Sequence, residues 1–171
     1  LLLNEPIPGT SGFTSLTRNV GSISNKGFEF VLNTTNFRTN NFRWTTSLNL
    51  TTLDNEVTEL PGGDIIQGRN IVRVGETISS FYLVEYAGVD PENGDALFYR
   101  NTENTDGSFD RTTTSSYSEA ERVITGSPYP NFMAGLTNTM TFSNFDFSLT
   151  FQGEWGASLY NEGGKFQSGN M

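Results

Sequence analysis

Residues 104–110 form the stretch whose composition and spacing best suit metal chemistry. Its candidate ligands are Asn104, Asp106 and Asp110. Calcium loops place oxygen ligands at alternate positions and a glycine at the sharp turn, and Gly107 stands at that turn. The spacing therefore predicts a structural calcium site in segment 102–113. Thr113 occupies the position at which such loops carry a bidentate glutamate, so a solvated turn is the alternative interpretation.

The rest of the sequence gives no indication of catalysis. The chain has no histidine and no cysteine, which removes the usual general base, thiolate metal sites and disulfides. Asp90, Glu92 and Asp95 lie within one predicted turn, whereas glycoside hydrolysis needs two carboxyls that flank a cleft. The net charge of −9 argues against a nucleic-acid partner. The sequence predicts no enzyme activity and no cofactor other than the candidate calcium ion.

The elements that position these residues are read from the alternation of polar and apolar side chains, which is most regular over residues 145–155. One set comprises Phe145, Phe147, Leu149, Phe151, Gly153 and Trp155. The intervening set comprises Asp146, Ser148, Thr150, Gln152 and Glu154. Successive side chains of a strand point to opposite faces, so this strand has one apolar and one polar face. Its length matches the roughly 9–11 residues that cross an outer membrane, whereas soluble strands usually have about 5–6.

Three further runs repeat this alternation. In residues 42–52 the apolar set is Phe42, Trp44, Thr46, Leu48 and Leu50, and Arg43 begins the polar set. Residues 132–142 alternate less regularly because Asn138 interrupts the apolar set. From residue 28 onward, Phe28, Phe30 and Leu32 alternate with Glu29, Val31 and Asn33. The sequence therefore predicts an all-β protein made of antiparallel strands, as in a transmembrane outer-membrane β-barrel with long extracellular loops.

The lengths of the connections predict the direction of each strand. Residues 36–41 and the pair 143–144 form short polar links, whereas residues 52–131 form a long excursion. Outer-membrane barrels have short periplasmic turns and long extracellular loops, so we expect the long excursion outside the cell. Within it, the sequence predicts strands at 80–89 and 96–100 that pair around a turn, followed by a loop at 101–122.

This layout predicts a role for each set of side chains. Lipid-facing or girdle positions are Phe42, Trp44, Phe145, Phe147, Leu149, Phe151 and Trp155. Lumen-facing positions are Glu29, Arg43, Asp146, Gln152 and Glu154, for which solvation of a polar wall is the alternative role. Candidate substrate-binding residues in or near the outer segments are Tyr82, Tyr86, Tyr117, Tyr129 and Tyr160. Tyrosine rings stack on sugars, although contacts with the wall or a partner are the alternative.

Two other classes of protein are compatible with the same strands. A soluble, secreted β-sandwich that binds glycans would bury the apolar faces in a core. A passive porin would use the same lipid-facing strands without an energy source. The hydrophobic content of 35% is lower than the about 45–50% of soluble domains, which favours strands with one watery face.

Several short motifs occur in order along the chain. They begin with Leu1-Leu2-Leu3-Asn4-Glu5-Pro6-Ile7-Pro8 and Asn25-Lys26-Gly27-Phe28-Glu29. They continue with Phe42-Arg43-Trp44, Gly88-Val89-Asp90-Pro91 and Gly126-Ser127-Pro128-Tyr129-Pro130, and end with Asn144-Phe145-Asp146. Each motif is weak by itself, but the ordered set covers nearly the whole chain. This set resembles the motifs of the SusC/RagA-type TonB-dependent outer-membrane transporters of Bacteroidota.

This resemblance implies that residues 1–171 are a segment of the later part of a barrel of about 22 strands. Such transporters import oligosaccharides or peptides across the bacterial outer membrane. They carry a plug domain, which is expected outside this chain, and draw energy from TonB through an N-terminal region. A SusD-like surface lipoprotein is their partner, and lipid surrounds the wall. The absence of an initiator methionine before Leu1 also suggests a piece of a longer protein.

Overall fold

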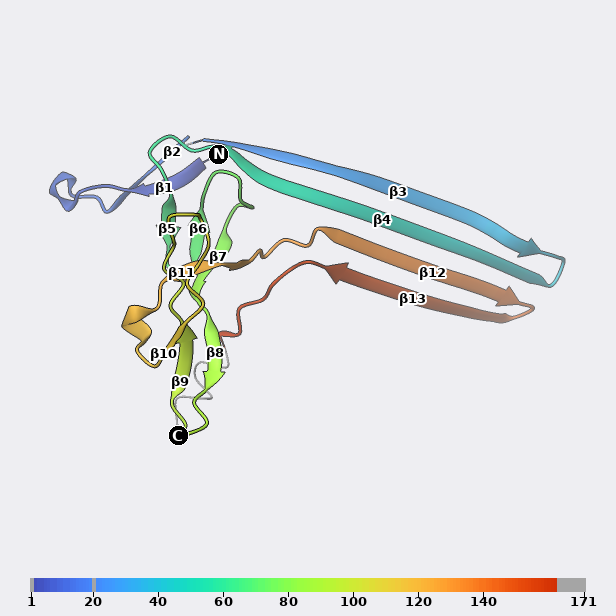
Figure 1. The fold of residues 1–171 in the computed structure, drawn as a ribbon. Coiled ribbons are helices and arrows are strands. Elements are labelled where there is room, and N and C mark those ends of the chain that lie inside the picture. The colour runs from blue at the N-terminus through green and yellow to red at the C-terminus, as the bar shows by residue number, and fades with distance from the viewer. Residues whose placement is uncertain (1, 20, 163–171) are drawn as a thin grey trace. The chain divides into compact units, whose positions relative to one another are not determined.

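A computed structural model describes residues 2–19 and 21–162 and consists mainly of antiparallel β-strands (Figure 1). The chain divides into two compact units. The first is Leu1–Ser22 with Val57–Ser127, and the second is Ile23–Glu56 with Pro128–Met171. No helix in the described part of the chain has the length and apolar character needed to span a membrane.

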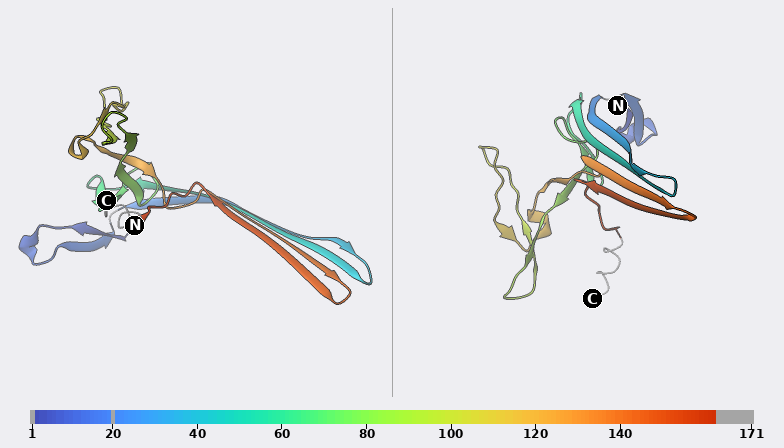
Figure 2. Two further views of the ribbon diagram at one scale, coloured as in Figure 1. Left: turned by 90° about the horizontal axis from the view of Figure 1, so that it is seen from below. Right: turned by 90° about the vertical axis from the view of Figure 1, so that its right-hand side faces the viewer.

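The second unit is built on one four-stranded antiparallel sheet in the order β13-β12-β4-β3. Its strands are β3 (Ser22–Arg38), β4 (Phe42–Glu59), β12 (Phe132–Phe142) and β13 (Phe145–Trp155). The views in Figures 1 and 2 show these long strands side by side as a single layer. The four predicted strands and their alternating directions are confirmed, and β12 and β13 have the predicted bounds. Strands β3 and β4 are longer than predicted because the two continue to pair where the alternation of apolar residues fades.

The register aligns the two kinds of side chain across the sheet. Leu136 of β12 lies opposite Leu48 of β4 and Phe151 of β13. Directly opposed residues of an antiparallel pair share a face, so the apolar sets of the three strands form one continuous surface. The polar sets form the other surface, where the Thr137 and Thr150 hydroxyls lie 3.1 Å apart.

Gly27 explains the close approach of β3 to β4. A Cβ atom at residue 27 would overlap the Thr52 carbonyl oxygen, because the two atoms would lie far inside van der Waals contact. The Phe28 backbone N–H also donates a 2.9 Å hydrogen bond to the Thr52 hydroxyl. Only glycine therefore fits at position 27 without moving the β4 backbone.

The first unit contains three small sheets. Strands β1 (Leu2–Pro6) and β2 (Ser15–Asn19) form a hairpin around the 3-10 helix η1 (Gly9–Ser11). A second sheet has the order β11-β7-β6-β5, and the third has the order β10-β9-β8. These strands are β5 (Ile65–Gln67), β6 (Asn70–Val72), β7 (Ser80–Val84), β8 (Tyr86–Val89), β9 (Ala96–Tyr99), β10 (Thr113–Thr114) and β11 (Arg122–Gly126). Val57, Leu60 and Val72 form a small buried cluster.

The prediction of a single strand at 80–89 is wrong, because the strand is broken at Glu85. Strand β7 pairs with β6 and β11, whereas β8 pairs with β9 in a different sheet. The Glu85 carbonyl accepts a hydrogen bond from the Tyr99 N–H, and its carboxylate is bound by Arg111 and Asn101. The chain therefore changes partners at this residue. Pairing of 86–89 with 96–99 around the 90–95 turn is as predicted.

Residues 101–122, predicted as a loop, contain ordered elements. Glu103 and Phe109 form an antiparallel bridge within a hairpin-like arm at 101–111. Strand β10 follows, and the 3-10 helix η2 (Tyr117–Glu119) precedes β11. The predicted extracellular position of the whole excursion is not tested by these contacts and stays a prediction.

Candidate functional site

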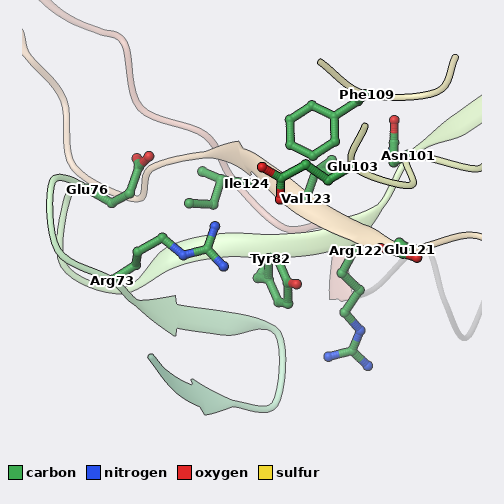
Figure 3. A pocket seen from close by; sticks show the side chains of 10 residues that line it. All are labelled: Arg73, Glu76, Tyr82, Asn101, Glu103, Phe109, Glu121, Arg122, Val123 and Ile124. Atoms are coloured by element: carbon green, nitrogen blue, oxygen red, sulfur yellow. The ribbon is translucent and has the colours of Figure 1, made fainter. Parts of the chain in front are cut away.

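The first unit holds an open pocket of about 460 Å³, which is within the size range of small-ligand sites (Figure 3). Its lining residues are Arg73, Glu76, Tyr82, Asn101, Glu103, Phe109, Glu121, Arg122, Val123 and Ile124. They come from strand β7, from strand β11 and the residue before it, from the segment after β6, and from the arm at 101–111. Residues far apart in the sequence thus share one site.

The pairing of β7 with β11 forms the base of the pocket. Tyr82 lies directly opposite Ile124, and Leu83 lies opposite Val123. The Tyr82 backbone N–H is fixed by a 2.7 Å hydrogen bond to the Arg69 carbonyl oxygen. Paired residues share a face, so the Tyr82 ring and the Ile124 side chain give the pocket an apolar patch.

Both guanidinium groups of the pocket have partners within the protein. Arg73 lies 2.7 Å from the Asp64 carboxylate, and its guanidinium carbon is 5.7 Å from the centre of the Tyr82 ring. The hydrogen bond to Asp64 raises the pKa of Arg73 above its ordinary value, so this group stays charged. Arg122 donates a 3.0 Å hydrogen bond to the Gly68 carbonyl oxygen.

The carboxylates of the pocket, unlike its guanidinium groups, have no described partner for their side chains. Glu76, Glu103 and Glu121 each line the pocket, and no side-chain partner is described for any of them. Glu103 lies across from Phe109 in the arm, and Figure 3 shows the Phe109 ring close to the Glu103 side chain.

Glu85, Asn101 and Arg111 fix the arm to the junction between β7 and β8. The Glu85 carboxylate accepts hydrogen bonds from Arg111 at 2.5 Å and from Asn101 at 2.9 Å. Asn101, which is buried, also accepts a 2.8 Å hydrogen bond from Arg111. The Arg111 guanidinium stacks 3.8 Å from the centre of the Tyr99 ring. The hydrogen bond from Arg111 is the main reason why the pKa of Glu85 is lower than its ordinary value.

The five predicted substrate-binding tyrosines do not form one site. Tyr82 lines the pocket, while Tyr86 and Tyr117 both contact Phe98, with ring centres 6.1 and 5.4 Å away. Tyr129 and Tyr160 belong to the second unit. Their predicted roles in substrate binding stay predictions.

In the predicted calcium loop, the acidic oxygens are used in local turns. Asp106 accepts hydrogen bonds from the Ser108 N–H and hydroxyl, and Asp110 accepts equivalent bonds from Thr112. These bonds lower the pKa of both carboxyls. Asn104 donates a 3.0 Å hydrogen bond to the Ser108 hydroxyl. Within the described ranges, no three acidic, histidine or cysteine side chains are close enough to hold a metal ion. Calcium binding stays a prediction.

In the second unit, the predicted lumen-facing and lipid-facing residues alternate along the strands of the sheet. Arg43 of β4 and Asp146 of β13 both lie opposite Thr141 of β12 and therefore share the polar face. Gln152 and Glu154 follow Asp146 on that face, while Glu29 alternates with Phe28 and Phe30 on β3. The apolar face carries Phe42, Trp44, Phe145, Phe147, Leu149, Phe151 and Trp155. Which face meets lipid stays a prediction.

Asn138, the residue that interrupts the apolar alternation, has partners on the apolar face itself. Its Oδ1 atom accepts a 3.0 Å hydrogen bond from the Trp44 indole N–H and a 2.7 Å bond from the Thr46 hydroxyl. Thr46 lies directly opposite Asn138. The side-chain oxygen of Asn138 is thus satisfied by its neighbours, as polar atoms in apolar surroundings require.

Sequence reasoning did not identify Arg73, Glu76, Glu103, Glu121 and Arg122 as pocket residues. These residues belong to no spacing motif, because three separate segments bring them together. Their charges alone gave no signal, since isolated charged residues in polar segments are usually solvated.

Comparisons with known proteins place the chain among large receptors. No family model matches it. It is 38% identical over 94% of its length to TonB-dependent receptor P26 of Formosa agariphila, and 34% identical over 94% to TonB-dependent receptor SusC of Bacteroides thetaiotaomicron. Among solved structures, the RagAB peptide importer in its closed-closed state matches 92% of the chain with a TM-score of 0.77 and 28% identity. The chain spans only 18% of P26, 16% of SusC and 18% of the matched RagAB chain.

Proposed function

Since this chain is a relative of the SusC/RagA-type TonB-dependent receptors, we propose that it forms part of a transporter that imports nutrients across the outer membrane. The strands of the second unit would belong to the barrel wall. The sheets of the first unit would form outer segments that meet the substrate. The chain itself would do no chemistry on that substrate.

The exposed apolar face of the β13-β12-β4-β3 sheet is the observation that carries this proposal. Phe145, Phe147 and Phe151 are 77%, 57% and 59% exposed. In a soluble β-sandwich, a second sheet would pack on this face about 10 Å away and bury it. A lipid-facing wall instead requires a single layer with its apolar side outward and its polar side toward a watery lumen.

The names of the relatives favour an active transporter over a passive porin. P26 and SusC are both called TonB-dependent receptors. We therefore propose that the intact protein draws energy through TonB and works with a SusD-like surface lipoprotein in the outer membrane of a member of the Bacteroidota. Oligosaccharides or peptides are its proposed substrates, and the matched RagAB structure is described as a peptide importer.

Fractionation of native cells tests this proposal directly. An antibody against residues 101–122 should detect a band in the outer-membrane fraction that is far larger than 18.9 kDa. The same antibody should label intact cells, because the arm is proposed to lie outside. Nutrient uptake should be lost when TonB is deleted, whereas uptake through a passive porin would continue.

A different result would favour one of the alternatives. A secreted or soluble band near 18.9 kDa would support a free-standing glycan-binding module and contradict the transporter. A periplasmic rather than surface location of residues 101–122 would reverse the proposed orientation of the strands.

A further inference from the structure

In the pocket of the first unit, the guanidinium groups have partners within the protein, whereas no side-chain partner is described for the carboxylates. We infer that this pocket selects ligands that carry a cationic amine next to an apolar surface. This inference rests on the proposed transport function, because the ligand would be the imported solute. The two candidate classes of ligand, lysine-containing peptides and amino sugars, share an ammonium group.

The carboxylates give the pocket its preference for positive charge. Glu76, Glu103 and Glu121 line it, and none of the three has a described side-chain partner. They are contributed by three different segments, so a ligand entering the pocket meets carboxylates on several sides. A cation bound there would gain Coulomb attraction without first breaking an internal ion pair.

The guanidinium groups offer much less to an anion. Arg73 already contacts the Asp64 carboxylate, and Arg122 already donates to the Gly68 carbonyl oxygen. Figure 3 shows the Arg122 side chain extending away from Phe109 and Glu103. An acidic ligand would have to compete with Asp64 for Arg73 and would meet three free carboxylates.

The aromatic rings supply the second part of the recognition. Phe109 lies opposite Glu103 in the arm and is 46% exposed. Tyr82 forms the opposite part of the lining and already lies against the Arg73 guanidinium. A ring face attracts an ammonium group and also covers the apolar carbons beside it. An exposed ring beside a free carboxylate is therefore a receptor for an alkylammonium or amino-sugar group.

Calorimetry on the intact receptor in detergent tests this inference with two matched pairs of probes. Trilysine is compared with trilysine whose side-chain amines are acetylated, and the glucosamine trimer with the N-acetylglucosamine trimer. We expect at least one amine probe to bind more tightly than its acetylated counterpart. Binding of only one amine probe would identify the source of the ammonium group.

Three variants locate the binding in the pocket. Glu103→Gln and Phe109→Ala should each lower the affinity for the amine probe by about two- to fivefold, as expected for an exposed charge pair and an exposed cation–π contact. Glu92→Gln removes the same charge from the exposed 90–95 turn, outside the pocket, and should leave the affinity unchanged.

The inference is overturned if neither amine probe binds, if acetylation has no effect, or if Glu103→Gln and Glu92→Gln act alike. A trimer of galacturonic acid that binds more tightly than the amines would also overturn it. TonB-dependent uptake and the outer-membrane location are measured in the same cells. If uptake and location are unchanged while the amines fail to bind, the inferred preference for amines is wrong and the proposed transport function stands.

Discussion

At the scale of single residues, Asn138 shows how the apolar face accommodates a polar group. We expect Trp44→Phe to destabilise the intact receptor by about 1 kcal/mol, because it removes one of two hydrogen bonds to Asn138 Oδ1 in an apolar setting. Urea unfolding in lipid vesicles measures this free energy. Trp155→Phe is the matched control, since Trp155 packs on Phe132 and no indole hydrogen bond is described for it.

A second substitution separates the hydrogen bond from packing. In an Asn138→Leu background the indole has no acceptor to lose, so Trp44→Phe should have a smaller effect there than in the native protein. Equal effects in the two backgrounds would show that the Trp44–Asn138 bond contributes nothing to stability.

Glu85 makes the attachment of the 101–111 arm dependent on pH. Its folded-state pKa lies below its ordinary value of 4.5, so its stabilising contribution is complete above that value and is lost as the pH falls through the folded pKa. The pair with Arg111 is partly exposed, so solvent screening keeps its contribution to stability small. Hydrogen exchange of residues 101–111, corrected for its intrinsic pH dependence, should therefore increase in acid.

The substitution Glu85→Gln gives the critical comparison for this pH effect. The variant should show faster exchange in the arm at neutral pH and little further change in acid. Glu92→Gln should behave as the native protein does. Exchange that is independent of pH in the native protein would contradict the assigned role of Glu85.

At the scale of elements, strand β13 tests which face meets lipid. Leu149→Arg should destabilise the intact receptor by about 2–4 kcal/mol near the membrane midplane, because a charge would enter hydrocarbon. Ser148→Arg, the adjacent residue on the polar face, should cost much less. Unfolding in vesicles measures both, and equal costs would show that the apolar face of β13 is not lipid-facing.

The contact between β3 and β4 at Gly27 gives another prediction at this scale. Gly27→Ala would push a methyl group into the Thr52 carbonyl oxygen, so we expect a loss of about 1–3 kcal/mol from forced displacement of the strands. Gly9→Ala is the control, because nothing lies within 4 Å of a Cβ atom there. Thermal unfolding that is unchanged by Gly27→Ala would mean that the strands separate without cost.

The strands differ in how well the sequence predicts them. The bounds of β13 follow from its regular alternation, and those of β12 follow from a less regular alternation together with the two-residue link to β13. The short strands β5 and β6 and the break at Glu85 are not, because they depend on tertiary partners such as Arg111. The pocket is similarly hidden, since Glu103 and Arg122 line one pocket only in the folded chain.

At the scale of the whole molecule, the distribution of apolar residues is the main departure from an ordinary soluble domain. The buried hydrophobic residues described are few and lie in the first unit, as Val57 and Ile71 do. Most of the large aromatic side chains described in the second unit are instead exposed, with Phe145 at 77%. We therefore predict that an environment covering this face stabilises the sheet, and the chain spans only 18% of P26.

The pairing of β4 with β12 also sets the order in which the wall can form. Strands β12 and β13 are joined by two residues, whereas the pairing of Phe42 with Phe142 closes a loop that contains the Val57–Ser127 segment of the first unit. Local hairpins form in about 1–10 μs, but contacts between distant parts of a chain pay a larger loop-closure entropy and form later. The β3–β4 and β12–β13 hairpins should therefore form first and pair with each other later. Pairing of β4 with β12 should then be the slowest step in forming this sheet.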